Sequence, residues 1–214
     1  MKNIWAIVPI KPLNRSKSRL SPVLNIEQRE ILSREMLDRT LGILKQVETI
    51  SDILVVSRDT AALKNIRQYG VQTLQESGAP ELNDSLTRAT QVVGSWNASA
   101  VLIVASDIPL LEVSDIENMI GLAEHAPAVV IATDRHQNGT NVMLVSPPGL
   151  ISYRYGEGSF HRHMEESRAR GVEPLLFESP TVALDVDIPE DFDLYRQMLA
   201  EREIGEPVWL GGKP

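Results

Sequence analysis

The sequence VLIVASDIPLL, residues 101–111, decides the fold that we expect for this chain. Its first four residues form an apolar run that is rich in β-branched side chains and too short for a helix, so it predicts a strand. Such continuous runs are typical of the middle of a parallel sheet, where helices cover both faces. Asp107 follows at the carboxyl end of this strand, where open α/β sheets bind their ligands. Asp107 is therefore a candidate metal ligand, and closure of a turn is the simpler alternative.

Apolar runs alternate with stretches of helical periodicity along the chain, which predicts an α/β fold with a mostly parallel sheet. Further strands are predicted at residues 4–8, 53–57, 71–74, 128–133, 142–146, 173–177 and 183–187. Helices are predicted at residues 26–47, 60–69, 82–93 and 159–170, with one more from a capping box at Ser114 and Glu117 and a last one from Pro189. The short connection between 128–133 and 142–146 predicts a hairpin, and therefore an antiparallel edge on the sheet.

The length of 214 residues fits one α/β domain, which we place at residues 1–200. A loop-like tail follows at residues 201–214. Within this tail we expect Trp209 and Leu210 to dock on the body of the protein or on a second subunit.

Charge and composition exclude several classes of function. The formal net charge of −8 argues against broad electrostatic binding of nucleic acid. The chain has no cysteine, which rules out disulfides, thiolate zinc sites and cysteine nucleophiles. No segment is apolar over a length that could span a membrane, and the N-terminal apolar run is too short for a signal peptide. We therefore expect a cytoplasmic protein with neither nucleic acid nor membrane as its partner.

A basic segment, KPLNRSKSR, follows the first predicted strand directly. Lys11, Arg15, Lys17 and Arg19 place four cations within nine residues, at the position where a doubly wound sheet has its first phosphate-binding loop. The segment lacks the glycines of a dinucleotide fingerprint and of a Walker A loop, so side-chain charge would hold a phosphate. A solvated basic loop is the alternative.

Polar residues at two predicted helix starts are further candidates. Asn83 has an amide that either caps its helix or reads the edge of a base. In YRYGEGSF, residues 153–160, Gly156 and Ser159 precede or open a helix whose first amides form a potential anion site. A glycine turn with a serine cap is the alternative. His161 and His163 lie two apart on this helix and point to different faces, so they suit a polar surface or a single phosphate contact rather than a metal.

A pair of carboxylates lies in the segment ALDVD, residues 183–187. Asp185 and Asp187 share one side of an extended chain because successive side chains alternate. Together with Asp107 they offer oxygen ligands to a hard cation such as Mg²⁺, which commonly bridges substrate phosphates. Helix-start chemistry is the alternative, and it better explains Glu190 and Asp191. Cations, aspartates and no evident serine or cysteine nucleophile together predict metal-assisted attack at a phosphorus atom.

Six motifs in order resemble the 2-phospho-L-lactate / phosphoenolpyruvate guanylyltransferase family, which acts in the biosynthesis of coenzyme F-420. They are KPL…KSRL from residue 11, Leu82-Asn83, SDIPLL from 106, DR…GTN from 134, GEGSF…H from 156 and DVDIPED from 185. The resemblance runs from the first strand to the last helix. Departures are Ser106 where alanine is usual, Ile108 for leucine and Ile188 for threonine, the last of which removes a hydroxyl near the aspartate pair.

The resemblance implies a three-layer nucleotidyltransferase-like (Rossmann-like) fold and a homodimer. It also implies that a phosphorylated three-carbon acid attacks the α-phosphorus of GTP and that pyrophosphate leaves. By the same resemblance Mg²⁺ is held by Asp107, Asp185 and Asp187, and the acid is bound by Thr140, Gly156 and Ser159. The triphosphate is held by Lys11, Lys17 and Arg19, with Asn83 near the nucleotide. The catalytic residues implied are Lys17, Arg19 and Asp107.

The identity of the acid stays open between phosphoenolpyruvate, 2-phospho-L-lactate and 3-phospho-D-glycerate, which differ by few contacts. We favour phosphoenolpyruvate because the YGEGSF…H stretch resembles bacterial members of the family. A sugar-phosphate or molybdenum-cofactor-type nucleotidyltransferase, a glycosyltransferase and a non-catalytic nucleotide-binding subunit are the rival interpretations. A Rossmann dehydrogenase is disfavoured because no glycine fingerprint follows a strand.

Overall fold

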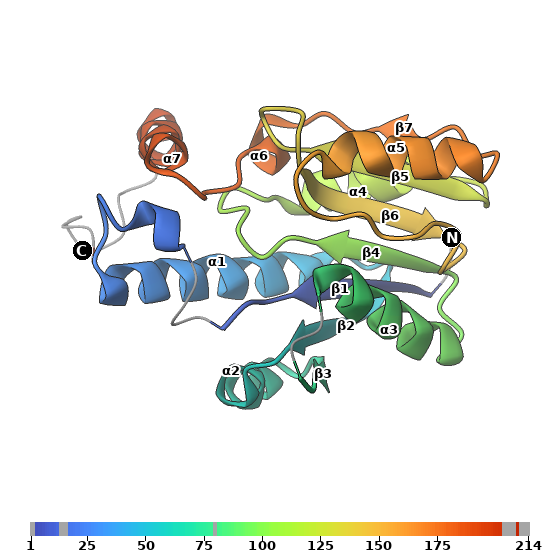
Figure 1. Ribbon diagram of the computed structural model, residues 1–214, viewed down its shortest axis with the longest axis horizontal. Coiled ribbons are helices and arrows are strands. Elements are labelled where there is room, and N and C mark those ends of the chain that lie inside the picture. Colours follow the sequence, from blue (N-terminus) through green and yellow to red (C-terminus); the bar gives the residue numbers. More distant parts are fainter. Residues whose placement is uncertain (1–2, 13–16, 79–80, 203–208, 210–214) are drawn as a thin grey trace.

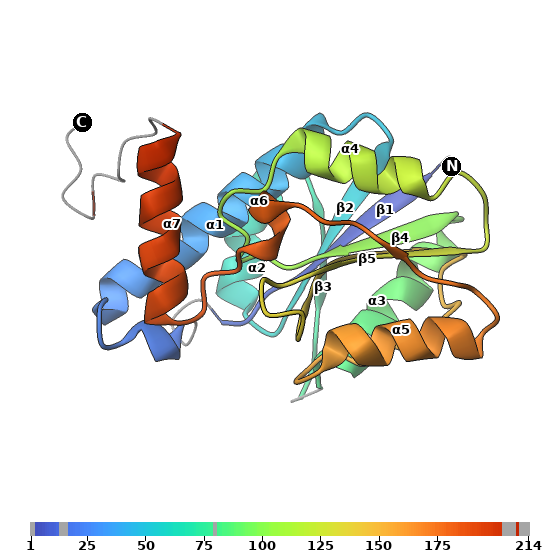
Figure 2. The same cartoon turned by 90° about the horizontal axis from the view of Figure 1, so that it is seen from above.

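The computed structural model describes residues 3–12, 17–78, 81–202 and 209, so Arg15 and Leu210 lie outside the described residues. A central sheet is covered by helices on both faces, which gives the three layers predicted (Figures 1 and 2). The strands are β1 (Ile4–Pro9), β2 (Ile50–Ser57), β3 (Gln72–Gln75), β4 (Ala100–Val104), β5 (Ala128–Thr133), β6 (Thr140–Ser146) and β7 (Leu175–Leu176).

The strands are arranged in the order β3-β2-β1-β4-β6-β5-β7. Neighbouring strands are parallel except at β6, which is antiparallel to both β4 and β5. The mostly parallel sheet and the β5–β6 hairpin are thus confirmed. The antiparallel strand β6 lies inside the sheet between β4 and β5, and its residues are buried throughout, as expected for a strand with both faces covered. The strand predicted at 173–177 shortens to the two residues of β7, parallel to β5.

Helices α1, α2 and α4 pack on one face of the sheet, and α3 and α5 pack on the other (Figure 2). The helices are α1 (Ile26–Gln46), α2 (Thr60–Ile66), α3 (Leu82–Ser95), α4 (Val113–Leu122), α5 (Ser159–Ala169), α6 (Pro180–Ala183) and α7 (Pro189–Glu201). Two short 3₁₀ helices are η2 (Ser18–Leu20) and η3 (Arg67–Tyr69). Among the described residues, none of these helices combines the length and apolarity that crossing a bilayer demands.

Local signals fix several of the helix boundaries. The reciprocal capping box of Asn25 and Gln28 opens α1, and Gly70 adopts a left-handed conformation (φ 68°) after η3, as predicted. Pro189 occupies the first turn of α7. These three boundaries therefore follow from the sequence.

The predicted start of the helix after β4 is wrong. The residue before α4 is Glu112, and its N–H donates to the carboxylate of Asp115 at 3.0 Å. Asp115 also accepts the hydroxyls of Ser179 and Thr181 at 2.7 and 2.6 Å. These distant partners, rather than a box at Ser114, fix the first turn of α4.

The predicted strand at 183–187 is also wrong. α6 ends at Ala183, and an extended segment runs beside the sheet without joining it. One backbone bond, from the Val186 N–H to the Asp107 oxygen at 3.2 Å, ties the segment to the end of β4. The predicted alternation holds nevertheless, because Leu184 and Val186 are buried while Asp185 and Asp187 are only partly buried.

A third apolar cluster joins η2, α1 and α7 beside the main sheet, with Leu20, Met36 and Phe192 among its members. Trp209 packs against this cluster and donates its indole N–H to Glu35 on α1 at 2.7 Å. The expected docking of the tail on the body is thus confirmed for Trp209.

Candidate active site

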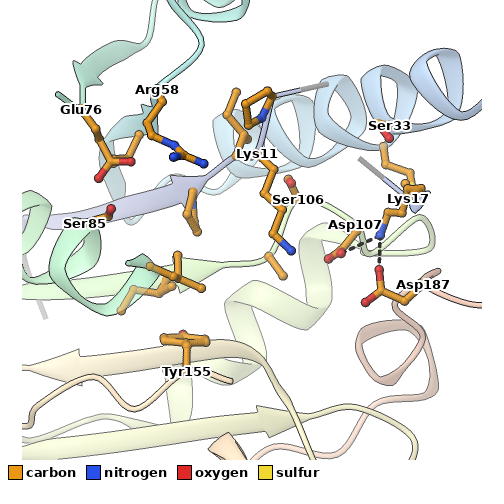
Figure 3. A pocket seen from close by; sticks show the side chains of 18 of the residues that line it. Lys11, Lys17, Ser33, Arg58, Glu76, Ser85, Ser106, Asp107, Tyr155 and Asp187 are labelled. Carbon is orange, nitrogen blue, oxygen red and sulfur yellow. Dashed lines mark hydrogen bonds and ion pairs between the residues drawn. The ribbon is translucent and has the colours of Figure 1, made fainter. Parts of the chain in front are cut away.

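A cavity of about 320 Å³ lies along the carboxyl ends of the parallel strands. Its walls come from the residues that follow β3, β2, β1 and β4, with α1, α3 and Tyr155 closing the sides. Figure 3 shows Arg58 and Glu76 at one end, and Lys17, Asp107 and Asp187 at the other. The volume falls in the range of small-molecule sites, and the position is the one that parallel sheets use for ligands.

Lys17 lies between two of the predicted metal ligands. Its ammonium is 2.7 Å from Asp107 Oδ2 and 2.7 Å from Asp187 Oδ1, and its side chain is only 6% exposed. The backbone at Lys17 is left-handed, with φ 53°, which is uncommon for a residue with a side chain. Burial would lower the pKa of Lys17, but the carboxylates of Asp107 and Asp187 outweigh burial and raise it. Lys17 therefore stays charged and neutralises the acidic end of the cavity.

Asp185 joins the same electrostatic group without lining the cavity. Burial, followed by the charges of Asp107 and Asp187, raises the pKa of Asp185 to about 7. Burial would also raise the pKa of Asp187, but the charge of Lys17 reverses this effect and lowers it. Among the described residues no three acidic or histidine side chains are close enough together to hold a metal ion. Asp107 and Asp187 already bind one cation, the Lys17 ammonium. Their carboxylate oxygens are also the ligand type that a hard cation such as Mg²⁺ prefers.

A partly buried ion pair between Arg135 and Asp191 holds the segment that carries Asp187. Arg135 contacts Asp191 through two guanidinium nitrogens at 2.8 and 2.9 Å. The other oxygen of Asp191 accepts the backbone N–H groups of Asp187 and Ile188 at 3.1 and 3.0 Å. Asp191 thus combines its predicted role at the start of α7 with the positioning of Asp187.

Thr140 reaches the cavity from the start of β6 and is backed by His163. The backbone N–H of Arg154 donates to His163 Nε2 at 2.9 Å, so the ring proton is on Nδ1 and points to Thr140 Oγ1, 2.9 Å away. The Ser159 hydroxyl lies 3.5 Å from the same oxygen. Because Thr140 accepts from within the protein, its own proton is available for a group in the cavity.

A sequence profile described as "Guanylyl transferase CofC like" matches residues 4–200 of the chain. The chain belongs to this family. Membership identifies it as a guanylyltransferase, a class of nucleotidyltransferase.

Relatives of the CofC-like guanylyl transferase carry names that agree with this assignment. The chain is 36% identical to a "phosphoenolpyruvate guanylyltransferase" of Rubrobacter xylanophilus, over 88% of this chain and 91% of that protein. It is 33% identical to a "2-phospho-L-lactate guanylyltransferase" of Methanothermobacter thermautotrophicus, over 87% and 81%.

Solved structures share the fold at lower sequence identity. A putative nucleotide-diphospho-sugar transferase from Desulfovibrio desulfuricans superposes with a TM-score of 0.75 at 16% identity, covering 93% of this chain and 88% of the other. A nucleotidyl transferase of Methanothermobacter superposes with a TM-score of 0.66 at 15% identity, covering 94% and 100%. The predicted nucleotidyltransferase-like fold is therefore confirmed.

The guanylyl transferase brings half of its ten predicted site residues to the cavity wall. Those that line the cavity are Lys11, Lys17, Asp107, Thr140 and Asp187. Those that do not are Arg19, Asn83, Gly156, Ser159 and Asp185. Arg19 is exposed on η2 and acts on the site at longer range, because its charge helps to lower the pKa of Asp187.

Asn83 does not take the capping role that was one of its two predicted alternatives. Its side-chain oxygen accepts the Tyr155 N–H at 2.7 Å, and its side-chain NH₂ donates to the Tyr155 oxygen at 3.2 Å. α3 begins at Leu82, so Asn83 does not cap it. Asn83 therefore positions the backbone of Tyr155, and its proximity to the nucleotide stays a prediction.

The amides before α5 are less free than the anion-site prediction requires. The Gly158 and Phe160 N–H groups donate to the side chain and backbone of Asn138 at 3.1 Å, and the Ser159 N–H donates to Gly156. The glycine turn is confirmed by positive φ angles of 122° at Gly156 and 70° at Gly158. These bonds fix the loop before α5 and with it the Ser159 hydroxyl, which lies beside Thr140.

The sequence prediction missed four residues of this region. Arg58, Glu76 and Tyr155 line the cavity, and His163 is fully buried behind Thr140 instead of lying on a polar surface. Arg58 and Glu76 each directly follow a parallel strand, so the carboxyl-end rule that singled out Asp107 also applied to them. No sequence pattern marks Tyr155 or His163 as buried beside the site.

Proposed function

We propose that the chain transfers GMP from GTP to phosphoenolpyruvate. The observation that carries this proposal is the pairing of Lys17 with Asp107 and Asp187 at the carboxyl edge of the sheet, in a cavity whose volume falls in the range of small-molecule sites. The names of the relatives supply the donor class and the acceptor. In this reaction a phosphate oxygen of the acid attacks the α-phosphorus of GTP. The new P–O–P bond forms as the bond to the β-phosphate breaks, and pyrophosphate leaves.

The predicted site residues that line the cavity bind the substrates or orient the groups that do. Lys17 and Lys11 hold the triphosphate by charge, and Thr140 donates its hydroxyl proton to the phospho-acid. Asp107 and Asp187 keep Lys17 oriented before the nucleotide arrives. No general base is needed, because the phosphate of the acid is already an anionic nucleophile near neutral pH. Catalysis then rests on positioning and charge stabilisation.

We also propose Mg²⁺ as the cofactor, with Asp107, Asp185 and Asp187 as ligands that would have to move closer together around the ion than they are in the structure. The support is the oxygen chemistry of the three carboxylates, together with the pKa of Asp185, which is raised by burial and then by the charges of Asp107 and Asp187. Bound Mg²⁺ would neutralise charge on the phosphates in the transition state. It would compete with the Lys17 ammonium for two of its three ligands.

The choice of acid rests on relatives such as the protein of Rubrobacter xylanophilus, whose name specifies phosphoenolpyruvate. The alternative acceptors are 2-phospho-L-lactate, named for the methanogen relative, and 3-phospho-D-glycerate. By family resemblance we place the reaction in the biosynthesis of coenzyme F-420. A homodimer and a cytoplasmic location stay predictions, and sedimentation velocity tests the first of these.

Pyrophosphate release is the experiment that tests this function. Purified protein is incubated with Mg²⁺, GTP and each acid in turn, with ATP, a sugar 1-phosphate and acid-free samples as controls. We expect release that needs both GTP and phosphoenolpyruvate, and we expect Asp107→Asn to lower it by at least about 100-fold. Release with a sugar phosphate in place of every acid would contradict the proposal, as would release from GTP alone.

A further inference from the structure

Two buried polar atoms lack a hydrogen-bond partner within the described parts of the chain, and both belong to residues of the cavity wall. They are Glu76 Oε1 and the Tyr155 hydroxyl. Folded proteins pair nearly all of their buried polar atoms, so an orphan atom in a cavity indicates a group that a ligand supplies. A carboxylate oxygen only accepts hydrogen bonds, so the ligand of Glu76 must present a donor.

The position of Glu76 is well fixed. Its backbone N–H donates to the Ser57 oxygen at 2.9 Å, which joins the end of β3 to the end of β2. Arg58 comes next after Ser57, so the two side chains enter the cavity from adjacent strand ends. Within the described residues they form no ion pair with each other or with any other side chain. Figure 3 shows both pointing into the cavity, at the end away from Lys17.

We propose that Glu76 reads the guanine base of the nucleotide, an inference that rests on the proposed use of GTP. Guanine presents two neighbouring donors, N1–H and the 2-amino group, which match the two oxygens of a carboxylate. Adenine presents an acceptor at N1 and no 2-amino group, so it leaves Glu76 unpaired. Arg58 donates to O6 and N7 on the adjoining edge, the geometry by which arginine commonly recognises guanine.

This placement orients the whole nucleotide. With the base at Glu76 and Arg58, the triphosphate runs along the strand ends toward Lys11 and then Lys17, which lie at the middle and far end of the same cavity (Figure 3). Asn83 does not line the cavity, and its amide is hydrogen-bonded to the Tyr155 backbone. Selection of the base thus falls to a carboxylate that the sequence alone did not single out.

A single substitution tests the inference. Glu76→Gln keeps the shape of the side chain but replaces one acceptor by a donor. Xanthine has a 2-oxo group where guanine has a 2-amino group, so it complements the glutamine amide. We expect kcat/KM with GTP to fall at least tenfold and the ratio of GTP to xanthosine triphosphate to shift by about 100-fold. Glu48→Gln, an exposed glutamate outside the cavity, is the matched control and should change neither value.

A second variant separates the two base readers. Arg58→Gln should weaken the binding of GTP, inosine triphosphate and xanthosine triphosphate equally, since all three carry O6 and N7.

The role of Glu76 can also be tested in the wild-type protein with inosine triphosphate, which differs from GTP only by the missing 2-amino group. We expect its dissociation constant to be about tenfold higher than that of GTP.

Calorimetric titration of each nucleotide keeps this inference distinct from the proposed reaction. A switch of binding toward xanthosine triphosphate in Glu76→Gln supports the reading of guanine even if no acid yields pyrophosphate. Unchanged GTP preference in Glu76→Gln, or equal binding of GTP and inosine triphosphate by wild-type protein, overturns it. Either of these results overturns it even when GMP transfer to an acid is observed.

Discussion

Lys17 is an internal counter-ion of Asp107 and Asp187, so removal of its charge should change the stability of the protein. Lys17→Met leaves Asp107 and Asp187 facing each other without a cation between them. We expect a lower melting temperature in the presence of a chelator, because like charges in a partly buried site repel. We expect Mg²⁺ to restore most of the loss, and GMP transfer to fall at least about 100-fold.

The control for this variant is Lys45→Met, which removes an exposed charge at the far end of α1. Its melting temperature should respond to Mg²⁺ as the wild-type protein does. If Lys17→Met gained no more from Mg²⁺ than Lys45→Met, the aspartates would not form a cation site.

His163 links the site to the stability of the fold through pH. Burial, with the charge of Arg162 as a second cause, lowers the pKa of His163 from 6.5 to about 4. The folded state therefore binds fewer protons than the unfolded state between these values. The contribution of the neutral ring to stability is full above pH 6.5 and is lost as the pH falls toward 4, by about 3 kcal/mol in total.

Urea unfolding of the His163→Gln variant between pH 7.5 and 4.5 measures this contribution. The wild-type protein should be more stable at pH 7.5, and the difference should shrink as the pH falls. His161→Gln, on the exposed side of the same helix, should follow the wild-type curve throughout. Parallel curves for wild type and His163→Gln would show that His163 does not titrate as inferred.

At the scale of elements, the start of α7 shows how the fold accommodates a departure from the family pattern. Ile188 stands at the N-cap without a side-chain hydrogen bond, in the extended conformation that a threonine cap also adopts. The carboxylate of Asp191 compensates by accepting the Ile188 N–H at 3.0 Å.

Ile188→Thr should therefore stabilise the protein. The added hydroxyl can accept an amide of the first turn of α7, and we expect a gain of about 0.5–1 kcal/mol after the loss of some apolar burial. Chemical denaturation measures the change, with Ile188→Ala as the comparison that loses the apolar contact and gains no cap. A threonine variant as unstable as the alanine variant would contradict the capping argument.

The sequence predicted those elements whose signals are local. The strand that begins the run at Val101 and the helix start at Asn25 depend only on residues that are close in the sequence. Both therefore appear in the structure as predicted. The start of α4 and the segment at 183–187 were mispredicted because distant residues decide them. Asp115 takes Ser179 and Thr181 as partners, and the Val186 N–H bonds to Asp107, beyond the end of β4, instead of joining a strand ladder.

At the scale of the whole molecule, the site lies where strands β1, β2 and β3 adjoin strands β4 and β6 in the sheet. β1, β2 and β3 bring Lys11, Arg58 and Glu76, while β4 and β6 bring Asp107 and Thr140. The strand-end rule and the family motifs located the acidic and basic residues. Glu76 directly follows β3, so the strand-end rule covers it, but no family motif singles it out. Nothing in the sequence places His163 behind Thr140, because a histidine on a polar helix acquires its surroundings only when the chain has folded.

The central claim is that GMP passes from GTP to a phospho-acid, and phosphorus-31 NMR of the reaction mixture tests it most directly. With GTP, phosphoenolpyruvate and Mg²⁺, we predict one equivalent of pyrophosphate for each equivalent of a new diphosphate diester. The resonance of the phosphoenolpyruvate phosphate should disappear in the same proportion. Loss of GTP to GMP or GDP with the phosphate of every phospho-acid left unchanged would contradict the account.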